Sequence, residues 1–292
     1  MPSARTATLV GFTAILMWSL LALLTAASGT VPPFQLAALT FAIGGGIGAL
    51  SWLGRRGAVA ALRQPFEVWA LGVGGLFGYH ALYFLALRLA PPAEAALVNY
   101  LWPLLIVLFS ALLPGERLRA HHVVGTLIGL AGTILLFLGG GGINFAQDYL
   151  PGFAAAFVAA FVWATYSVLS RRFAGVSTDA VVGFCLATAL LAFLFHRAFE
   201  TTVWPATAGQ WLAVAGLGIG PVGAAFYAWD VGVKRGDIRV LGAASYAAPV
   251  LSTALLVLAG FAPASMTLAL SAALIAGGGL IAAKDMWLRP KR

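Results

Sequence analysis

The chain has 292 residues, of which 61% are hydrophobic and only 9% are charged. Soluble domains carry about 25% charged residues, so this composition excludes a water-soluble domain, and the low charge also excludes a disordered tail protein. A single cysteine, Cys185, excludes a disulfide-stapled secreted scaffold. The net charge of +8 does not indicate a nucleic-acid partner, because the cations are scattered in small groups. The composition predicts a protein embedded in the lipid bilayer.

Ten apolar segments follow one another along the chain, each long enough to cross about 30 Å of hydrocarbon. The first could be confused with a signal peptide, because Ala26, Ala27 and Ser28 resemble a cleavage site. However, its apolar run exceeds the roughly 7 to 15 residues of a signal sequence, so we expect a retained first helix. The predicted spans are 6–28, 34–53, 66–88, 93–113, 119–138, 151–170, 178–198, 209–233, 238–260 and 265–286.

The basic residues fall almost entirely on one side of the membrane when these spans alternate in direction. Only Arg88 and Arg197 fall on the other side. Because Lys and Arg concentrate in cytoplasmic loops, this asymmetry predicts ten crossings with both termini in the cytoplasm. The cations on the cytoplasmic side are Arg5, Arg55, Arg56, Arg63, Arg117, Arg119, Arg171, Arg172, Lys234, Arg235, Arg239, Lys284, Arg289, Lys291 and Arg292.

An offset of 145 or 146 residues superimposes features of the two halves of the chain. It predicts one repeat over 1–146 and a second over 147–292, and because each has five helices the second must enter the membrane in the opposite sense. Inverted repeats also occur in channels and other bundles, but in secondary transporters the substrate site lies between them near the midplane. We therefore predict an all-α multi-pass membrane protein with ten transmembrane helices as two inverted five-helix repeats around a central cavity. The matching positions are Trp18 with Trp163, Gly74 with Gly220, Asn99 with Ser245, and Pro103 with Pro249.

Pro103 and Pro249 are predicted to interrupt hydrogen bonding in the fourth and ninth spans. Proline lacks an N–H, so each should leave the carbonyl four residues earlier unpaired, at Asn99 and at Ser245. Paired breaks beside polar side chains favour a polar binding surface. The alternative is two simple kinks that improve helix packing.

Tryptophan normally concentrates at membrane interfaces. Trp18, Trp102 and Trp163 instead lie near the middle of their spans, where they predict a cavity for a molecule with an apolar body and a polar end. The alternative is aromatic packing between helices. Further candidates for the cavity lining follow from helical spacing and from the symmetry of the two halves. Helical spacing adds Tyr79, His80, Tyr83, Asn99 and Tyr166, and symmetry adds Ser245 and Tyr246. The tryptophans expected near span ends are Trp52, Trp69, Trp204, Trp211, Trp229 and Trp287.

His80 is the only ionisable side chain predicted well inside a span, and such groups are functional candidates. It could bind substrate or take up a proton, so the coupling of transport is left open. Asp230 is expected to pair locally with Lys234 at i+4. His121 and His122 are expected in a solvated basic turn.

The sequence contains no P-loop, no H-E-x-x-H motif and no serine nucleophile elbow. We therefore expect neither an enzyme nor a pump that itself hydrolyses a nucleotide, and no cofactor or metal site.

Two segments resemble members of the drug/metabolite transporter superfamily with EamA-type repeats. EAALVNYLWPLLIVLFSALLPGERL at 94–118 resembles their fourth helix, and FVAAFVWATYSVLSRR at 157–172 resembles their sixth. The resemblance implies a bacterial inner-membrane location and export of aromatic and some other neutral amino acids through a central cavity. It carries a binding role onto Asn99, Tyr100 and Trp102 in the first segment and onto Trp163 and Tyr166 in the second.

We therefore predict a secondary transporter that exports neutral, preferentially aromatic, amino acids from the cytoplasm by alternating access. One alternative is an exporter of other lipophilic or cationic metabolites or drugs, and another is a receptor or structural protein that moves no solute. The expected partners are an amino acid and the lipid bilayer, with no nucleic acid. The sequence leaves the oligomeric state open, and a monomer is compatible with it.

Overall fold

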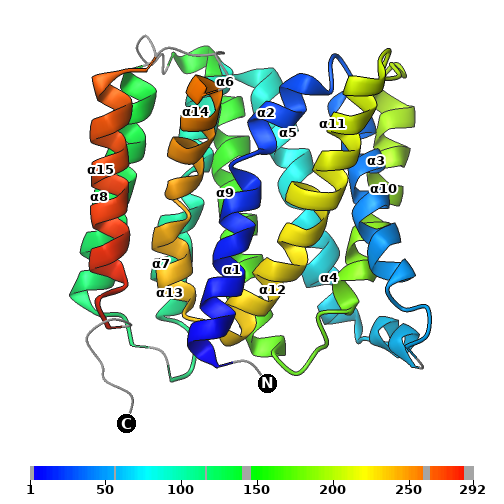
Figure 1. Ribbon diagram of the computed structural model, residues 1–292, viewed down its shortest axis with the longest axis horizontal. Helices are drawn as coiled ribbons and strands as arrows, with labels where there is room; N and C mark the ends of the chain where they lie inside the picture. Colours follow the sequence, from blue (N-terminus) through cyan, green and yellow to red (C-terminus); the bar gives the residue numbers. More distant parts are fainter. Residues whose placement is uncertain (1–2, 56, 116, 140–145, 259–263, 286–292) are drawn as a thin grey trace.

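The computed structural model describes residues 3–55, 57–115, 117–139, 146–258 and 264–285, and within these ranges the chain is helical and forms no strand (Figure 1). Arg56, Trp287, Arg289, Lys291 and Arg292 lie outside the described residues. The α-helices are α1 (Ala4–Trp18), α2 (Leu21–Ala27), α3 (Pro33–Leu50), α4 (Phe66–Val73), α5 (Tyr79–Leu89), α6 (Pro92–Asn99), α7 (Trp102–Ser110), α8 (Ala120–Leu138), α9 (Leu150–Ser170), α10 (Ala180–Phe199), α11 (Ala208–Ile219), α12 (Ala225–Arg235), α13 (Ile238–Ala244), α14 (Ala247–Leu258) and α15 (Met266–Ala282).

Eight helical segments are long and apolar enough to cross a membrane. Two shorter apolar segments, Glu94–Ser110 and Met266–Ala282, occupy the positions of the fourth and tenth predicted spans. The described helices therefore match the predicted ten-span, all-helical architecture. The ends of the ninth and tenth predicted spans, at 259–260 and 286, lie outside the described residues.

Several spans are interrupted near their middle. A turn of π-helix, η2 (Gly74–Gly78), joins α4 to α5, and a second, η5 (Gly220–Ala224), joins α11 to α12. The fourth span is broken between α6 and α7, and the ninth between α13 and α14. The two π segments begin 146 residues apart, the offset seen in the sequence. The division into two inverted repeats stays a prediction.

Two antiparallel helix pairs flank the molecule, α3 with α10 on one side and α8 with α15 on the other (Figure 1). Between them, α1 crosses α12 so closely that only glycine fits at the contact. A Cβ atom on Gly11 would lie 2.9 Å from the Cα of Gly232, and a Cβ on Gly232 would lie 2.6 Å from the Cα of Gly11. Small residues of this kind let helix backbones approach in lipid.

Charged groups join α3 to α10 at both ends. At the end of the bundle where α3 begins, the buried Glu200 carboxylate accepts hydrogen bonds from the N–H groups of Phe34 and Gln35, at 3.0 and 3.1 Å. A carboxylate at a helix N-terminus is stabilised by the helix dipole. At the other end, Arg55 forms a 2.6 Å ion pair with Asp179. Partial burial raises the pKa of Asp179, but the hydrogen bonds from Arg55 hold it below its usual value.

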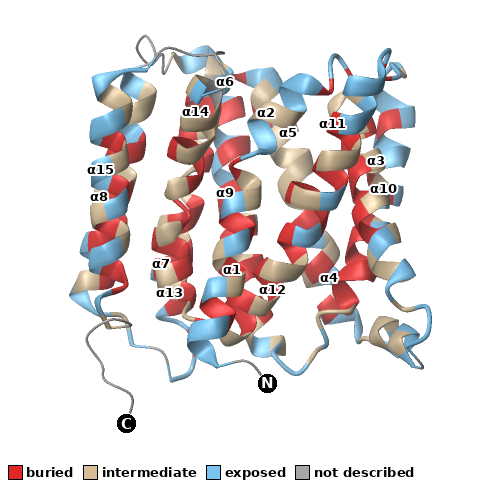
Figure 2. Ribbon diagram, viewed as in Figure 1, coloured by how far each residue is buried: buried red, intermediate tan, exposed pale blue. Residues whose placement is uncertain are grey.

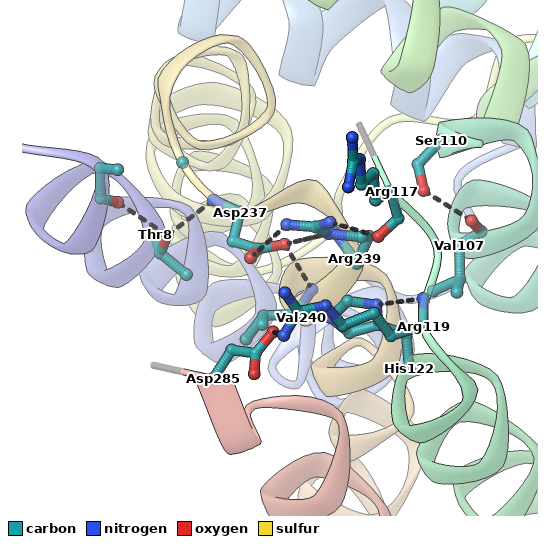
Figure 3. A network of polar contacts seen from close by, with 12 residues as sticks. Thr8, Val107, Ser110, Arg117, Arg119, His122, Asp237, Arg239, Val240 and Asp285 are labelled. Carbon is teal, nitrogen blue, oxygen red and sulfur yellow. Dashed lines mark hydrogen bonds and ion pairs between the residues drawn. The ribbon is translucent and has the colours of Figure 1, made fainter. Parts of the chain in front are cut away.

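We call the end of the bundle where α1 begins and α15 ends the inner face, and the opposite end the outer face. Figure 3 shows the polar network at the inner face. Asp237 donates its N–H to Thr8 on α1 at 2.8 Å and forms a 2.9 Å ion pair with Arg239. Arg239 also donates to the carbonyl of Arg117 at 2.8 Å. The network therefore joins α1, α13 and the segment before α8. Burial by itself would raise the pKa of Asp237. The hydrogen bonds and the charge of Arg239, together with nearby backbone N–H groups, outweigh this effect, so the pKa is below its usual value and the carboxyl is ionised at neutral pH.

Figure 2 shows where the helices carry exposed residues, and many of these residues are large and apolar, as expected where lipid is the solvent. Leu190, Leu212 and Phe193 are each at least half exposed. Trp204 and Trp211, predicted near span ends, are 60% and 43% exposed and stack on each other at the outer face.

The close crossing of α1 and α12 generates a prediction. Gly232→Ala should force the two helices apart and lower the free energy of unfolding by about 1 to 3 kcal/mol, as overpacking does. Thermal unfolding in detergent measures the change. Gly46→Ala is the matched control, because a Cβ there meets open space. An unchanged melting temperature for Gly232→Ala would show that the backbone contact is not tight.

Candidate functional site

A cavity of about 130 Å³ lies where the interrupted helices meet. Trp18, Tyr79 and Trp163 each lie near the middle of the apolar segment that carries them, so the cavity lies near the middle of the membrane. An engineered cavity of about 150 Å³ accommodates benzene, so this one is close to the size of a single aromatic ring. Its lining residues are Trp18, Leu21, Tyr79, His80, Tyr83, Asn99, Tyr100, Trp102, Trp163, Pro221, Val222, Phe226 and Ala248.

The π segment η2 fixes the orientation and tautomer of His80. His80 Nδ1 lies 2.7 Å from the carbonyl oxygen of Leu76, within η2. A carbonyl only accepts hydrogen bonds, so Nδ1 carries the proton and donates it. In the neutral ring, Nε2 is left with a lone pair. His80 therefore offers the cavity a hydrogen-bond acceptor without a formal charge.

The second π segment positions Trp18 in the same way. The indole N–H of Trp18 donates to the carbonyl of Pro221, in η5, at 3.1 Å. Local π-helix leaves carbonyls out of the regular α-helical pattern, and such bulges are frequent at functional sites. Each π segment thus supplies one carbonyl that orients one cavity side chain.

Indole and phenol rings form the cavity walls. Trp18 packs edge-on against Trp102 and Trp163, with ring centroids 6.2 and 5.7 Å apart. Tyr79 lies 5.3 Å from Trp163 and stacks parallel to Tyr83 at 6.0 Å. Edge-on and offset contacts of this kind hold rings in fixed orientations. The walls can therefore contact an aromatic guest on several sides.

Neutral polar groups supply the hydrogen-bonding capacity of the cavity. Asn99 donates to the Tyr79 hydroxyl at 3.0 Å. The hydroxyls of Tyr83 and Tyr100 form no hydrogen bond with another group in the described part of the chain. No Asp, Glu, Lys or Arg is among the described lining residues. The site therefore suits a molecule without net charge that has polar groups to satisfy.

Trp229 closes the cavity region toward the inner face. Its ring is fully buried and lies 5.0 Å from Trp18, and its indole N–H donates to the Ser167 hydroxyl at 3.1 Å. The expectation that Trp229 lies at a membrane interface is wrong. The cause is the predicted ion pair that begins at the next residue, Asp230 with Lys234 at 2.8 Å, which the structure confirms and buries. With its charges paired, this turn of α12 packs inside the bundle.

Three residues predicted for the site do not line the cavity. Tyr166 packs beneath Trp163 at 5.3 Å and against Gly75. Ser245 is buried and donates its hydroxyl to the Leu241 carbonyl at 2.7 Å. Tyr246 is buried against Gly129 on α8. Tyr166 supports the wall from behind, whereas Ser245 and Tyr246 belong to the packing of α13 and α14.

The two prolines accompany complete helix breaks rather than kinks. Pro103 lies in the first turn of α7, and Pro249 in the first turn of α14. The expected free carbonyl at Ser245 is absent, because the N–H of Ala248 donates to it at 3.1 Å. At this helix break the Ser245 carbonyl is therefore hydrogen-bonded in a tighter turn than that of an α-helix. The two breaks therefore do not offer the same polar groups.

Sequence reasoning missed several lining residues of the second half. Phe226 stacks on Phe41 and lies 6.2 Å from His80, and Ala248 forms part of the wall. Both were accessible from the duplication, since an offset of 146 carries His80 onto Phe226 and Trp102 onto Ala248. Neither residue has a polar group, so the sequence alone does not distinguish them from residues that pack between helices.

A histidine cluster lies away from the cavity, at the inner face. His122 is 1% exposed, so the expectation of a solvated turn is wrong for it. The possible ligand atoms of His121, His122 and Asp285 lie within 4.8 Å of one another. However, His122 Nδ1 accepts the N–H of Arg119, so the neutral ring carries its proton on Nε2 and offers a metal no lone pair. Asp285 also pairs with Arg119 at 2.7 Å. The cluster fits a helix cap better than a metal site.

Interrupted membrane helices that surround a cavity at mid-depth are the arrangement of secondary transporters. The chain belongs to the EamA-like transporter family, which it matches over residues 5–138 and 150–284.

The chain is similar to known members of this class over nearly its full length. It is 62% identical over 282 residues to the aromatic amino acid exporter YddG of Ancylobacter novellus, covering 96% of this chain and 98% of the relative. It is 28% identical to the exporter of the same name from Salmonella typhimurium, covering 99% of each. A crystal structure of a protein 62% identical in sequence superposes with a TM-score of 0.92, covering 96% of this chain and 99% of that chain.

Because Trp229 is buried on the inner side of the site, shortening its side chain should destabilise the protein. Trp229→Ala removes a buried ring and should lower the free energy of unfolding by about 3 to 5 kcal/mol. Trp229→Phe keeps an aromatic ring and loses the bond to Ser167, for about 1 kcal/mol. Thermal unfolding in detergent gives both values. Trp211→Ala, at an exposed ring, is the control. Equal melting temperatures for the two alanine variants would contradict the packing described.

Proposed function

We propose that this chain is a secondary transporter that exports neutral, preferentially aromatic, amino acids from the bacterial cytoplasm by alternating access. The cavity carries the proposal: indole and phenol rings surround a space for one aromatic ring, with neutral polar groups beside it. The relatives named as aromatic amino acid exporters support the same substrate class. Catalysis is not part of the proposal.

The cavity chemistry fits a zwitterion. The lone pair on His80 Nε2 accepts a hydrogen bond from the substrate ammonium, while the Tyr83 and Tyr100 hydroxyls donate to the carboxylate. No buried ion pair forms, so substrate leaves without breaking one. The proposal assigns binding to these three and to Trp18, Tyr79, Asn99, Trp102 and Trp163.

The proposed membrane orientation follows from the basic residues. The first turn of α1, the turn after α9 and the last turn of α12 lie at the inner face and carry Arg5, Arg171, Arg172 and Lys234. The last turns of α5 and α10 lie at the outer face and carry Arg88 and Arg197. The positive-inside rule then assigns the inner face to the cytoplasm of the inner membrane. Buried Trp229, Val233 and Ile238 fill the space between the cavity and the inner face. We therefore propose that the resting cavity opens outward.

Counterflow in proteoliposomes tests the function. Vesicles loaded with unlabelled phenylalanine should accumulate labelled phenylalanine transiently, and labelled tryptophan should compete. An organic cation should not exchange, because the described cavity lining contains no carboxylate to balance its charge. Exchange of the cation without exchange of phenylalanine would favour the metabolite or drug exporter. No exchange of any solute would favour a non-transporting protein.

Matched variants connect the flux to the cavity. Tyr79→Ala and Trp163→Ala should each lower the initial exchange rate of phenylalanine about fivefold, because one aromatic contact contributes about 1 kcal/mol. Trp211→Ala, on the exposed surface, should exchange at the wild-type rate. Equal rates in all three variants would assign these cavity rings to packing alone.

A further inference from the structure

The offset between the two halves of the chain relates three pairs of positions at which both residues line the cavity. Two of these pairs carry a ring in each half. In the third pair, Trp102 carries an indole and Ala248 carries only a methyl group. The cavity wall is therefore unequal at one pair of related positions. The pairs with a ring in each half are Trp18 with Trp163, at an offset of 145 residues, and His80 with Phe226, at 146.

Trp102 and Ala248 hold similar places in the two broken spans. Trp102 begins α7 after the break in the fourth span, and Ala248 lies in the first turn of α14 after the break in the ninth. The two spans pack against each other (Figure 1), because a Cβ atom on Gly242 of α13 would lie 2.9 Å from Val107 Cγ2 and 3.1 Å from the Pro103 carbonyl oxygen. Each break therefore places the start of a helix at the cavity, one with an indole and one with a methyl group.

Ala248 has the smallest side chain among the described lining residues. It is 7% exposed and belongs to the same cluster of buried apolar residues as Trp102 and Trp163. Its backbone is fixed, because its N–H donates to the Ser245 carbonyl at 3.1 Å. A methyl group has no alternative rotamer that could reach further into the cavity. The space beside Ala248 is therefore a permanent feature of the wall.

The polar groups of the cavity lie on its outer side. Tyr83 is one turn beyond Tyr79 on α5, which ends at the outer face, and Tyr100 contacts Phe137 in the last turn of α8 at 6.0 Å. On the inner side, Trp102 contacts Trp229 at 6.0 Å. An amino acid whose ammonium and carboxylate bind the outer polar groups therefore directs its side chain inward, toward the starts of α7 and α14.

We propose that Ala248 determines the largest side chain that the cavity accepts, and that the ring of a bound aromatic amino acid lies against its methyl group. This inference rests on the proposed function and names the residue that sets its substrate range. The cavity of about 130 Å³ is close to the size of one ring, so an indole, with two fused rings, needs all the room that Ala248 leaves. A larger side chain at this position excludes tryptophan first, phenylalanine next and alanine last, because a packed wall does not yield to added atoms.

Counterflow with three labelled amino acids tests the proposal. Exchange rates of tryptophan, phenylalanine and alanine are measured separately in proteoliposomes that contain the same amount of protein. Ala248→Val adds two methyl groups and should lower the ratio of the tryptophan rate to the alanine rate at least about tenfold, since one methylene in an apolar pocket changes discrimination by about that factor. The ratio of the phenylalanine rate to the alanine rate should fall less.

The preceding alanine provides the matched control. Ala247 lines a separate apolar hollow beside α1 and α15, so Ala247→Val adds the same two methyl groups to the same turn of α14 but outside the cavity. It should keep the wild-type ratio of tryptophan to alanine exchange. An equal fall in the ratio for both variants would assign the effect to α14 as a whole and would overturn the role of Ala248.

Ala248→Gly tests the same claim in the opposite direction. It removes the methyl group, enlarges the cavity and should raise the ratio of tryptophan to alanine exchange. This variant decides the matter if Ala248→Val exchanges nothing at all. A wild-type ratio in Ala248→Gly, or in an Ala248→Val variant that still exchanges amino acids, would overturn the inference while leaving the proposed function intact. A wild type that exchanges no amino acid would instead contradict the proposed function, and the inference with it.

Discussion

The structure depends on one constraint, that every backbone polar group inside a bilayer must be satisfied without bulk water. Continuous helices meet it easily, and irregular backbone meets it only where protein or a cavity surrounds it. The interruptions at η2, η5 and the α6–α7 break all adjoin the aromatic cavity. There the irregular backbone becomes useful, because the carbonyls of Leu76 and Pro221 orient His80 and Trp18. The same backbone that would destabilise a lipid-facing helix organises the site.

The cavity separates two roles that aromatic rings share in membranes. Trp204 and Trp211 lie exposed at the outer face, as interfacial tryptophans do. Trp18, Trp102 and Trp163 form walls at mid-depth, and Trp229 closes the inner side beneath them. A site built from rings and neutral hydrogen-bonding groups avoids the cost of placing isolated charges in hydrocarbon. The buried ion pair of Asp230 with Lys234 lies within α12 and is completed by hydrogen bonds to Thr178 and to the carbonyl of Val176.

Much of this architecture was predictable from the sequence, because the length and hydropathy of each span are properties of one contiguous stretch of residues. The mid-span positions of Trp18, Trp102 and Trp163 likewise indicated the cavity. The rotation of each helix about its own axis, which decides which side chains face the cavity, was not predictable. Symmetry placed Tyr246 as the counterpart of Tyr100, yet Tyr246 packs against Gly129 because that glycine leaves room for its ring. Trp229 was placed near a span end because Asp230 and Lys234 follow it; their pairing was predicted, but the burial of the pair inside the bundle is visible only in the folded chain.

In the proposed mechanism the aromatic cavity holds the substrate and is closed toward the inner face. A cysteine at Ala248, introduced into a Cys185→Ser background, probes it directly with a membrane-impermeant thiol reagent. Modification is expected when the reagent reaches the outer face, and slower modification when phenylalanine is present. Modification from the inner face alone, or a rate that phenylalanine does not change, would contradict it.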